Sequence, residues 1–306
     1  MDFCKKNKLK KPNFFIVGAP KCGTTAMNDY LAKHPQVFMA QKEVLYFGKD
    51  LKPRLRLSEE EYLRLFQKAG EQKIVCEASV WYLFSKTAAA EIKAFSPNAK
   101  ILIMLRDPVE VLYSMHSQHL YNGNEDVNDF ETAINLDDER KKGDNLPDAV
   151  DFLELPPYKD SVLFYEQVKR YLDVFGKENV HIVLYEDFIK DTPKVFNETL
   201  QFLGITSNHN VTFQIVNANK KISSLSLHGF IKKPPKSLKK IARAIIPAKK
   251  IRHHLMLIIL NANIKVAKRK KMNVKLQSEL RSFFAEDILK LANIINRDLS
   301  PWLKEQ

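Results

Sequence analysis

The stretch that decides the fold is Phe14-Phe15-Ile16-Val17-Gly18-Ala19-Pro20-Lys21-Cys22-Gly23-Thr24-Thr25-Ala26-Met27. The apolar run at residues 14–17 predicts a buried strand, and residues 18–20 end it in a tight turn. Residues 24–33 predict a helix that stops before Pro35. A strand, a glycine-bounded loop and a helix together place backbone N–H groups and a helix N-terminus where they can hold a phosphate.

This loop is close to the nucleotide-binding pattern G-x-x-x-x-G-K-[ST], but it differs at one position. Gly18 and Gly23 have the required spacing, and Thr25 stands at the hydroxyl position. Thr24 replaces the lysine that should follow the second glycine, and the only lysine of the loop is Lys21. A cation there lies beside the end of a bound phosphate chain, not on the β- and γ-phosphates of a triphosphate. From this stretch alone, a strand, turn and helix that merely pack together remain the alternative.

A second motif follows the apolar run at residues 101–105, which predicts another buried strand parallel to the first. Arg106 comes directly after it, at the edge where open α/β sheets bind their ligands. Asp107, a proline and Glu110 form the pattern of a helix start with a capping box. Ser114 follows about two turns along that helix. An arginine fork with a serine hydroxyl suits a second phosphate clamp, although Arg106 taken alone equally fits an ordinary surface arginine.

Together these two motifs resemble the two signatures of PAPS-dependent sulfotransferases. In that family the first loop binds the 5′-phosphosulfate of the donor, and the second clamp binds its 3′-phosphate. Further segments match in family order, at residues 42–47, 77–79, 185–188 and 297–303. The resemblance therefore covers most of the chain, and it implies PAPS (3′-phosphoadenylyl sulfate) as the co-substrate.

Within that family the chain is most similar to the heparan-sulfate-type and bacterial branch. The C-terminal R-K-G-x-x-G loop of the cytosolic phenol and steroid enzymes, which use a histidine base, does not occur here. The Lys42-Glu43 segment resembles the segment that carries the glutamate base of the heparan-type and bacterial enzymes. Two departures stand out: Ala78 takes the place of a lysine found in some heparan-type enzymes, and residues 268–271 are only the nearest equivalent of the family's basic C-terminal loop.

The resemblance implies a role for each matching residue. Glu43 would act as the general base toward the acceptor, and Lys21 would neutralise the charge that grows as the 3′,5′-bisphosphate leaves. Without the resemblance Glu43 is one carboxylate among many. The residues expected to bind the donor are Lys21, Cys22, Gly23, Thr24, Thr25, Ala26, Arg106 and Ser114.

The expected fold is α/β and P-loop-like, with three α/β/α layers, a central, mostly parallel sheet and a helical, basic C-terminal part. A chain of 306 residues with 45% hydrophobic residues is long enough for this as a single sulfotransferase domain over residues 1–306. No leading apolar segment precedes the first strand, so we expect no signal peptide or transmembrane segment. Three cysteines without metal-ligand spacing favour the reducing cytoplasm. We also expect no metal, because His116 and His119 have no third ligand placed near them.

Charge is distributed unevenly along the chain. Residues 199–278 contain no Asp or Glu and 17 of the 49 Lys and Arg, so the surplus of +13 lies in this segment. Three interpretations stay open: contact with a polyanionic acceptor or the PAPS phosphates, contact with an anionic membrane surface, or a solvated basic face. Specific nucleic-acid binding is disfavoured because the segment has almost no aromatic residues for base stacking.

The predicted function is transfer of a sulfuryl group from PAPS to a hydroxyl or amine, with a saccharide as the first and a small metabolite as the second expected acceptor. Two long loops, at residues 121–129 and 141–157, are expected to carry acceptor specificity. The alternatives are a P-loop nucleotide kinase, disfavoured by the missing lysine after Gly23, and a non-catalytic polyanion-binding protein on the same fold.

Overall fold

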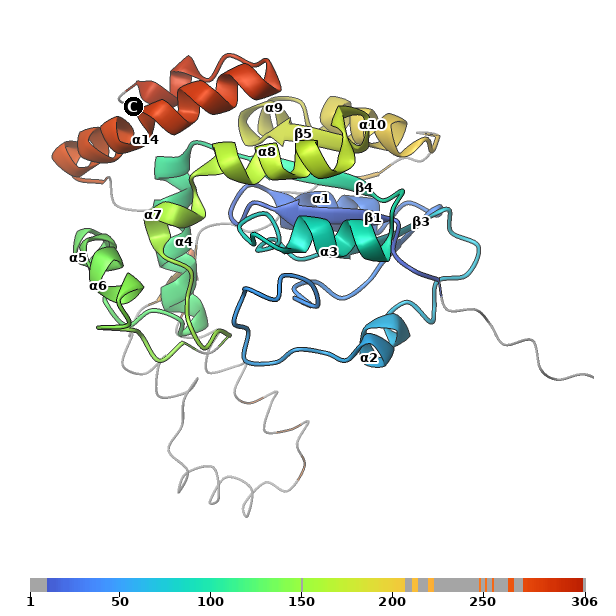
Figure 1. Ribbon diagram of the computed structural model, residues 1–306, viewed down its shortest axis with the longest axis horizontal. Helices are drawn as coiled ribbons and strands as arrows, with labels where there is room; N and C mark the ends of the chain where they lie inside the picture. Colours follow the sequence, from blue (N-terminus) through green and yellow to red (C-terminus); the bar gives the residue numbers. More distant parts are fainter. Residues whose placement is uncertain are drawn as a thin grey trace, which may run out of the picture.

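The computed structural model describes residues 10–149, 151–206, 211–213, 220–222, 264–266 and 272–304, and the single residues 248, 251 and 255. Its centre is a five-stranded sheet in which every neighbouring pair of strands is parallel (Figure 1). The strands, in spatial order, are β2 (Val37–Met39), β3 (Ile74–Ala78), β1 (Phe14–Gly18), β4 (Lys100–Leu105) and β5 (Val180–Leu184). A separate antiparallel pair joins β6 (Lys220–Ile222) and β7 (Ile264–Val266).

The middle strand of the sheet is β1, and its sequence explains why. The side chains of residues 14–17 are fully buried, since helices cover both faces of the sheet and leave no polar side. The chain passes from β1 to β2 and β3 on one side and returns to β4 and β5 on the other. The order therefore reverses beside β1, and the crevice outside the carboxyl ends of β1 and β4 is where such sheets bind ligands.

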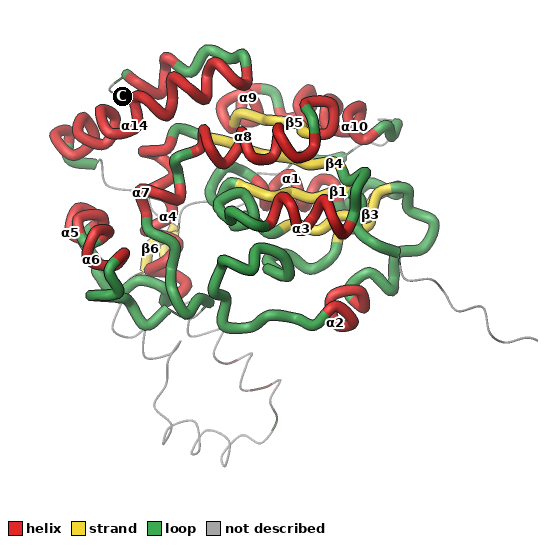
Figure 2. Tube along the Cα trace, viewed as in Figure 1, coloured by secondary structure: helices red, strands yellow, loops and turns green. Residues whose placement is uncertain are grey.

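Helices form the two outer layers. α3 (Ala88–Phe95) and α8 (Phe164–Phe175) pack together in front of the sheet in Figure 1, and α1 (Thr24–Leu31) lies behind it. α4 (Pro108–Asn122) follows β4 and carries the second motif. The remaining helices and 3-10 turns of the described chain are α2 (Glu59–Arg64), α5 (Phe130–Asn135), α6 (Asp137–Lys141), α7 (Tyr158–Ser161), η1 (Lys177–Asn179), α9 (Tyr185–Lys190), α10 (Thr192–Leu203), α14 (Val274–Ile295) and η2 (Ser300–Leu303) (Figure 2).

This architecture confirms the predicted α/β class and its three layers, and the main sheet is more regular than expected because all of its strands are parallel. The first predicted helix ends at Leu31, two residues before the expected Lys33. Most of the basic segment 199–278, including residues 268–271, lies outside the described residues.

A buried ion pair ties α14 to the second motif. Nη2 of Arg281 lies 3.0 Å from Oδ2 of Asp107, and both side chains are almost completely buried. Arg281 also donates to the backbone carbonyl of Trp302 in η2. Asp107 accepts a hydrogen bond from the backbone N–H of Val109 and so caps α4. The C-terminal helix thereby fixes the point at which β4 turns into α4, next to Arg106.

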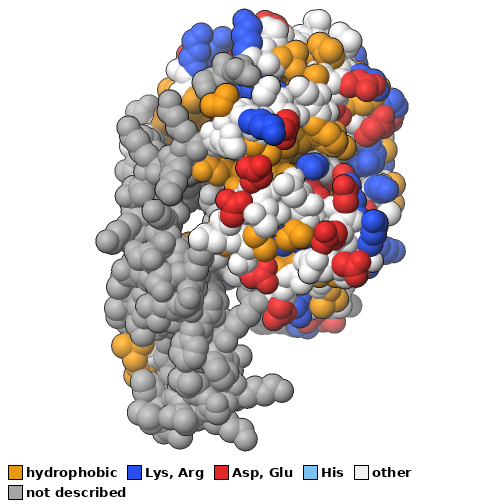
Figure 3. All heavy atoms as spheres, turned by 90° about the vertical axis from the view of Figure 1, so that its left-hand side faces the viewer, with side chains coloured by type: hydrophobic (Ala, Val, Ile, Leu, Met, Phe, Trp, Pro, Cys, Tyr) orange, Lys and Arg blue, Asp and Glu red, His pale blue; other side chains and the backbone are white. Residues whose placement is uncertain are grey.

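The face that carries α5, α6 and one end of α14 shows acidic and basic side chains interspersed among the described residues, with no large patch of one sign (Figure 3). In the part of the chain that the structure describes, none of the helices has the length and apolarity needed to cross a membrane.

Candidate functional site

A cleft of about 1310 Å³ lies at the carboxyl edge of the sheet. It brings together both predicted motifs, since Lys21, Arg106, Ser114 and Glu43 all line it. These residues come from the loop after β1, the end of β4, the helix α4 and the segment after β2. The switch in strand order beside β1 places all four at one edge.

The first loop has the geometry of a phosphate cradle. Gly23 stands at the N-cap of α1 with φ of 89°, in the left-handed region that favours glycine. A Cβ atom there would also lie only 3.1 Å from the Tyr185 ring. Because glycine has no side chain to cap the helix, the N–H groups of the first turn are left for a ligand, and Thr24, Thr25 and Ala26 line the cleft.

Lys21 extends from this loop toward α4. Its φ is 66°, an uncommon conformation for a residue with a side chain, and its Nζ atom donates to Oε1 of Gln118 at 3.0 Å. Gln118 is held in turn by a hydrogen bond from its Nε2 atom to Oδ1 of Asn122. The ammonium group is therefore positioned between the loop and α4.

The side chain of Cys22 does not take part in the cleft. It is fully buried, and its Sγ atom donates to the carbonyl of Pro20 at 3.4 Å. Burial raises the pKa of this thiol, so its place at the start of a helix does not make it a thiolate. Any contribution of Cys22 to donor binding comes from its backbone.

Arg106 and Ser114 form the second part of the cleft. The guanidinium of Arg106 lies 4.6 Å from the centre of the Tyr185 ring and 3.1 Å from Glu110. The expected capping box is absent, because the Glu110 carboxylate turns to Arg106, while the backbone N–H of Asp107 faces Glu186 at 3.5 Å. Arg106 is thus an oriented cation, in contrast to an ordinary surface arginine.

The segment after β2 supplies Glu43. Its backbone N–H donates to the carbonyl of Ala78 at 2.8 Å, and its Oε2 atom accepts from the N–H of Val80 at 3.2 Å. Glu43 is exposed to solvent and lines the cleft, where neighbouring protein atoms partly desolvate its carboxylate. Desolvation raises the pKa of Glu43, Lys42 partly offsets this, and Asp151 adds to it. A raised pKa suits a general base near neutral pH.

Sequence reasoning gave no role to Lys42, but the structure places it in the cleft. Its Nζ atom donates to Oγ1 of Thr25 at 2.9 Å, so the residue before the candidate base reaches the phosphate loop. Burial lowers the pKa of Lys42, and Glu43 opposes that shift. The sequence indicated this role of Lys42 only indirectly. Because the loop lacks the usual lysine after Gly23, a cation from elsewhere in the chain could be expected beside it.

The loop that carries Glu43 is held by Arg56. This guanidinium donates to backbone carbonyls along the loop, those of Leu45, Tyr46, Phe47, Gly48 and Leu51. The backbone N–H groups of Gly48 and Lys49 donate to Glu91 of α3. A loop with so many backbone groups satisfied is ordered, which fixes the direction in which the candidate base points.

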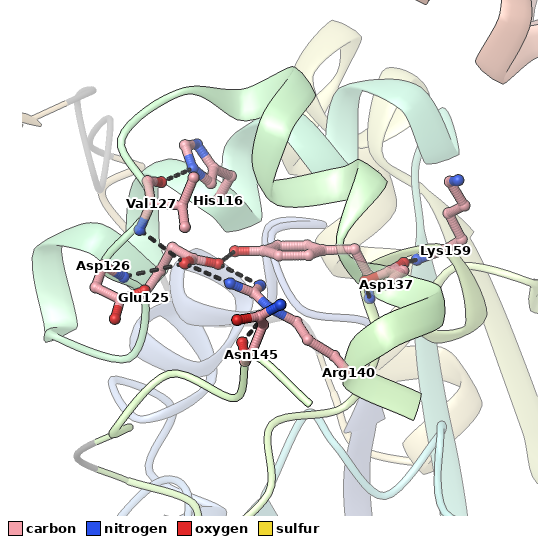
Figure 4. Close-up of polar contacts among 9 residues, drawn as sticks. His116, Glu125, Asp126, Val127, Asp137, Arg140, Asn145 and Lys159 are labelled. Carbon is pink, nitrogen blue, oxygen red and sulfur yellow. Dashed lines mark hydrogen bonds and ion pairs between the residues drawn. The ribbon is translucent and has the colours of Figure 1, made fainter. Parts of the chain in front are cut away.

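The other wall of the cleft is supported by a buried polar network (Figure 4). Arg140 of α6 donates to both carboxylate oxygens of Glu125, at 2.7 and 2.9 Å, and the Tyr158 hydroxyl donates to the same group at 2.9 Å. His116 of α4 is bonded to the carbonyl of Val127 at 2.9 Å. The buried ion pair of Arg140 with Glu125 holds the loop after α4 in one arrangement. That loop contributes Asn124 to the cleft.

The chain is similar to known sulfotransferases. The family described as "Sulfotransferase domain" matches residues 11–286. Carbohydrate sulfotransferase 15 of Rattus norvegicus is 30% identical over 248 residues, which are 63% of this chain and 44% of that protein. Heparan sulfate glucosamine 3-O-sulfotransferase 3A1 of Mus musculus is 30% identical over 121 residues, which are 40% of this chain and 30% of that protein. The chain therefore spans less than half the length of these two relatives.

Among solved structures, a sulfotransferase from Alicyclobacillus acidocaldarius resembles this one with a TM-score of 0.71 and 28% sequence identity. The match covers 96% of this chain and 100% of that chain. The three-layer arrangement around the parallel sheet is thus shared over almost the whole chain.

Proposed function

The chain belongs to the sulfotransferase domain family, and we propose that it transfers a sulfuryl group from PAPS to a hydroxyl or amine. One observation carries this proposal: the phosphate loop, the arginine and serine clamp and the candidate base Glu43 line a single cleft. Such a cleft suits a donor that carries phosphates at both ends of a nucleoside. It also leaves room for an acceptor next to the Glu43 carboxylate.

The residues present fit this donor. The uncapped start of α1 and the glycine at its N-cap suit the 5′-phosphate, which Gly23, Thr24, Thr25 and Ala26 would bind through N–H and hydroxyl groups. Arg106 and Ser114 would bind the 3′-phosphate, the group that distinguishes PAPS from ATP. PAPS supplies the sulfuryl group, with its bisphosphate as the leaving group.

Glu43 takes the proton from the acceptor in this proposal. The acceptor oxygen or nitrogen then forms its bond to sulfur as the bond between sulfur and the bridging oxygen breaks. Lys21 stabilises the negative charge that develops on that oxygen, and Lys42 adds a second positive charge beside Thr25. The metal-binding role of a kinase P-loop is not needed for this chemistry.

Saccharides and small metabolites are the proposed acceptors. The two relatives described above carry names that refer to carbohydrate and heparan sulfate, which supports a saccharide for this chain. We further propose the cytoplasm as its compartment, because Cys22 and Cys76 are both free and buried. Contact of the basic segment with a polyanion or an anionic membrane surface stays a prediction for residues outside those described.

Thermal shifts with adenosine 3′,5′-bisphosphate, ATP, and ATP with Mg²⁺ test the donor site. The proposal requires the largest stabilisation with the bisphosphate, and transfer of labelled sulfate from PAPS to a component of an acceptor pool. Preference for ATP with Mg²⁺ would instead indicate a kinase, and the absence of any nucleotide response would indicate a non-catalytic binder.

A further inference from the structure

The part of the cleft around Glu43 is built from two predicted specificity loops and the segment 51–57. Pro53 forms an antiparallel bridge with Phe152, and the backbone N–H of Arg54 donates to the carbonyl of Asp151 at 3.0 Å. Trp81 packs edge-on against Phe152, with 5.7 Å between ring centres. The residues Pro53, Trp81, Asp151 and Phe152 line the cleft at this end, and the two aromatic residues are largely buried. The arrangement combines aromatic walls with polar groups.

His119 is an unusual member of this wall. It lines the cleft with only 5% of its surface exposed, and neither of its ring nitrogens has a hydrogen-bond partner among the described residues. Its ring stacks on Trp81 at 6.2 Å. Burial lowers the pKa of His119 to about 3, so the ring is neutral and offers one donor and one acceptor. A buried polar group without a partner is unfavourable, and a ligand hydroxyl, itself both donor and acceptor, would supply that partner.

Asp151 and Asn124 add a second hydrogen-bonding pair. The Nδ2 atom of Asn124 donates to Oδ2 of Asp151 at 2.8 Å, and the N–H of Asp151 donates to Oδ1 of Asn124 at 3.0 Å. These mutual bonds hold the carboxylate in a fixed orientation at the cleft. A carboxylate accepts hydrogen bonds from hydroxyl groups, and Asp151 lies near enough to Glu43 to raise the pKa of that base.

Two carboxylates, Glu43 and Asp151, line the part of the cleft where the acceptor would lie. Asp151 raises the pKa of Glu43 and Lys42 lowers it, but the Lys42 ammonium donates to Thr25 of the phosphate loop. Arg54 also lines the acceptor part of the cleft, but it is engaged by Asp148 at 2.9 Å and by the carbonyl of Ala149 at 2.7 Å. An acceptor that carries carboxylates or sulfates would bring negative charge against these two carboxylates.

From these observations we infer, on the basis of the proposed function, that the acceptor is a neutral saccharide. One of its hydroxyls lies at Glu43, and others bind His119 and the Asp151–Asn124 pair, while its C–H surface packs against Trp81 and Phe152. A simple phenol is a poorer fit than a saccharide. Its single hydroxyl would lie at Glu43, so no hydroxyl would remain to bond His119. The residues that hold the sugar are distinct from those that hold the donor.

The test measures donor and acceptor binding separately on the full chain. Calorimetry with adenosine 3′,5′-bisphosphate reports the donor site. With the bisphosphate bound, neutral tetrasaccharides (maltotetraose and N-acetylchitotetraose) and the anionic tetragalacturonate are titrated while tryptophan fluorescence is followed. The chain has two tryptophans. Only Trp81 lines the cleft, whereas Trp302 lies in η2, so Trp81→Phe identifies the fluorescence signal that comes from the cleft.

A neutral tetrasaccharide is expected to bind the bisphosphate complex and, in a separate assay with labelled PAPS, to accept the sulfuryl group from it. Tetragalacturonate should bind at least tenfold more weakly. Asp151→Asn and His119→Ala should each weaken the neutral sugar at least tenfold without changing bisphosphate affinity. Asp151 is exposed, so Asp151→Asn keeps the test valid if His119→Ala fails to fold. The matched control Asp144→Asn, exposed on the same loop and outside the cleft lining, should bind as the wild type does.

If the bisphosphate binds but tetragalacturonate is preferred, no neutral sugar binds, or both variants behave as the wild type, this inference is overturned and the proposed function stands. If the bisphosphate does not bind at all, the proposed function is overturned, and the inference that rests on it is overturned too.

Discussion

The Nζ atom of Lys42 lies 2.9 Å from the Oγ1 atom of Thr25, and this contact joins the candidate base segment to the phosphate loop. Glu43 follows Lys42 directly, so the same short segment offers a cation to the donor and a carboxylate to the acceptor. The contact also supplies a positive charge near the loop where the lysine of the nucleotide-binding pattern is missing.

Lys42 is therefore expected to contribute to donor binding as well as to turnover. Lys42→Met, which removes both the charge and the hydrogen bond, should lower kcat/KM for PAPS roughly tenfold or more, the scale of one charge-assisted hydrogen bond. Lys42→Arg should retain part of the activity because it keeps the charge. Steady-state kinetics with PAPS check this, and wild-type kinetics in Lys42→Met would remove the residue from the site.

Lys21 is expected to act mainly on the chemical step. Lys21→Ala should lower kcat roughly a hundredfold or more, which is the scale of losing one preorganised stabiliser of developing charge. The exposed Lys49, outside the cleft, serves as the control, and Lys49→Ala should turn over at the wild-type rate. Single-turnover measurements separate this effect from product release. A small loss in Lys21→Ala would mean that another group stabilises the leaving bisphosphate.

Arg106 should matter for binding the 3′-phosphate. Arg106→Ala is expected to weaken adenosine 3′,5′-bisphosphate by roughly 10- to 100-fold, since a hydrogen bond to a charged group contributes about 1.5–3 kcal/mol. Arg64→Ala is a matched control, because Arg64 forms the same kind of i,i+4 pair with a glutamate but lies exposed on α2. Calorimetry with the bisphosphate provides the measurement. Equal affinity in both variants would contradict the clamp.

The fall of kcat/KM on the acidic side of its pH profile should reflect protonation of Glu43. Desolvation raises the pKa of this carboxyl, and only the deprotonated form accepts a proton, so kcat/KM should fall with decreasing pH at values above those of an ordinary glutamate. Asp151 raises the pKa of Glu43 and Lys42 lowers it. Asp151→Asn should therefore move this fall to lower pH, and Lys42→Gln should move it to higher pH. A fall that neither substitution moves does not reflect protonation of Glu43.

The neighbouring carboxyl Glu77 makes a prediction about stability. It is fully buried beneath the cleft, accepts from Ser79 and Tyr62, and burial raises its pKa from 4.5 to about 7. Because the folded state holds this proton more tightly than the unfolded state, stability falls as pH rises through that window, by about 3 kcal/mol in total.

Glu77→Gln cannot release this proton, so its stability should change less between about pH 5 and pH 8 than that of the wild type. Urea unfolding of both proteins at the two pH values gives the comparison. Equal changes would show that Glu77 does not ionise in this range.

The part of the site that is local in sequence was predictable. The apolar run at residues 14–17 and the glycines that follow fix a strand, loop and helix within a few residues of each other, and Arg106 follows its strand directly. Because parallel strands bring their carboxyl ends to one edge, the meeting of these two motifs also follows from the sequence.

The parts that were not predictable depend on partners distant in the chain. The ion pair of Arg281 with Asp107 joins residues 174 positions apart, and no local pattern announces it. The capping box at Glu110 was wrong because Glu110 pairs with Arg106, four positions earlier, while the backbone N–H of Asp107 faces Glu186, 79 positions away. His119 fits a buried helix face by pattern, and only the fold shows that it lines the cleft without a partner.

The most direct test of the central claim is a crystal structure of the protein with adenosine 3′,5′-bisphosphate. We predict the 5′-phosphate on the N–H groups of residues 23–26 with Lys21 beside it, and the 3′-phosphate on Arg106 and Ser114. A bisphosphate bound elsewhere, or one in this cleft with Lys21 turned away from it, would contradict the assignment.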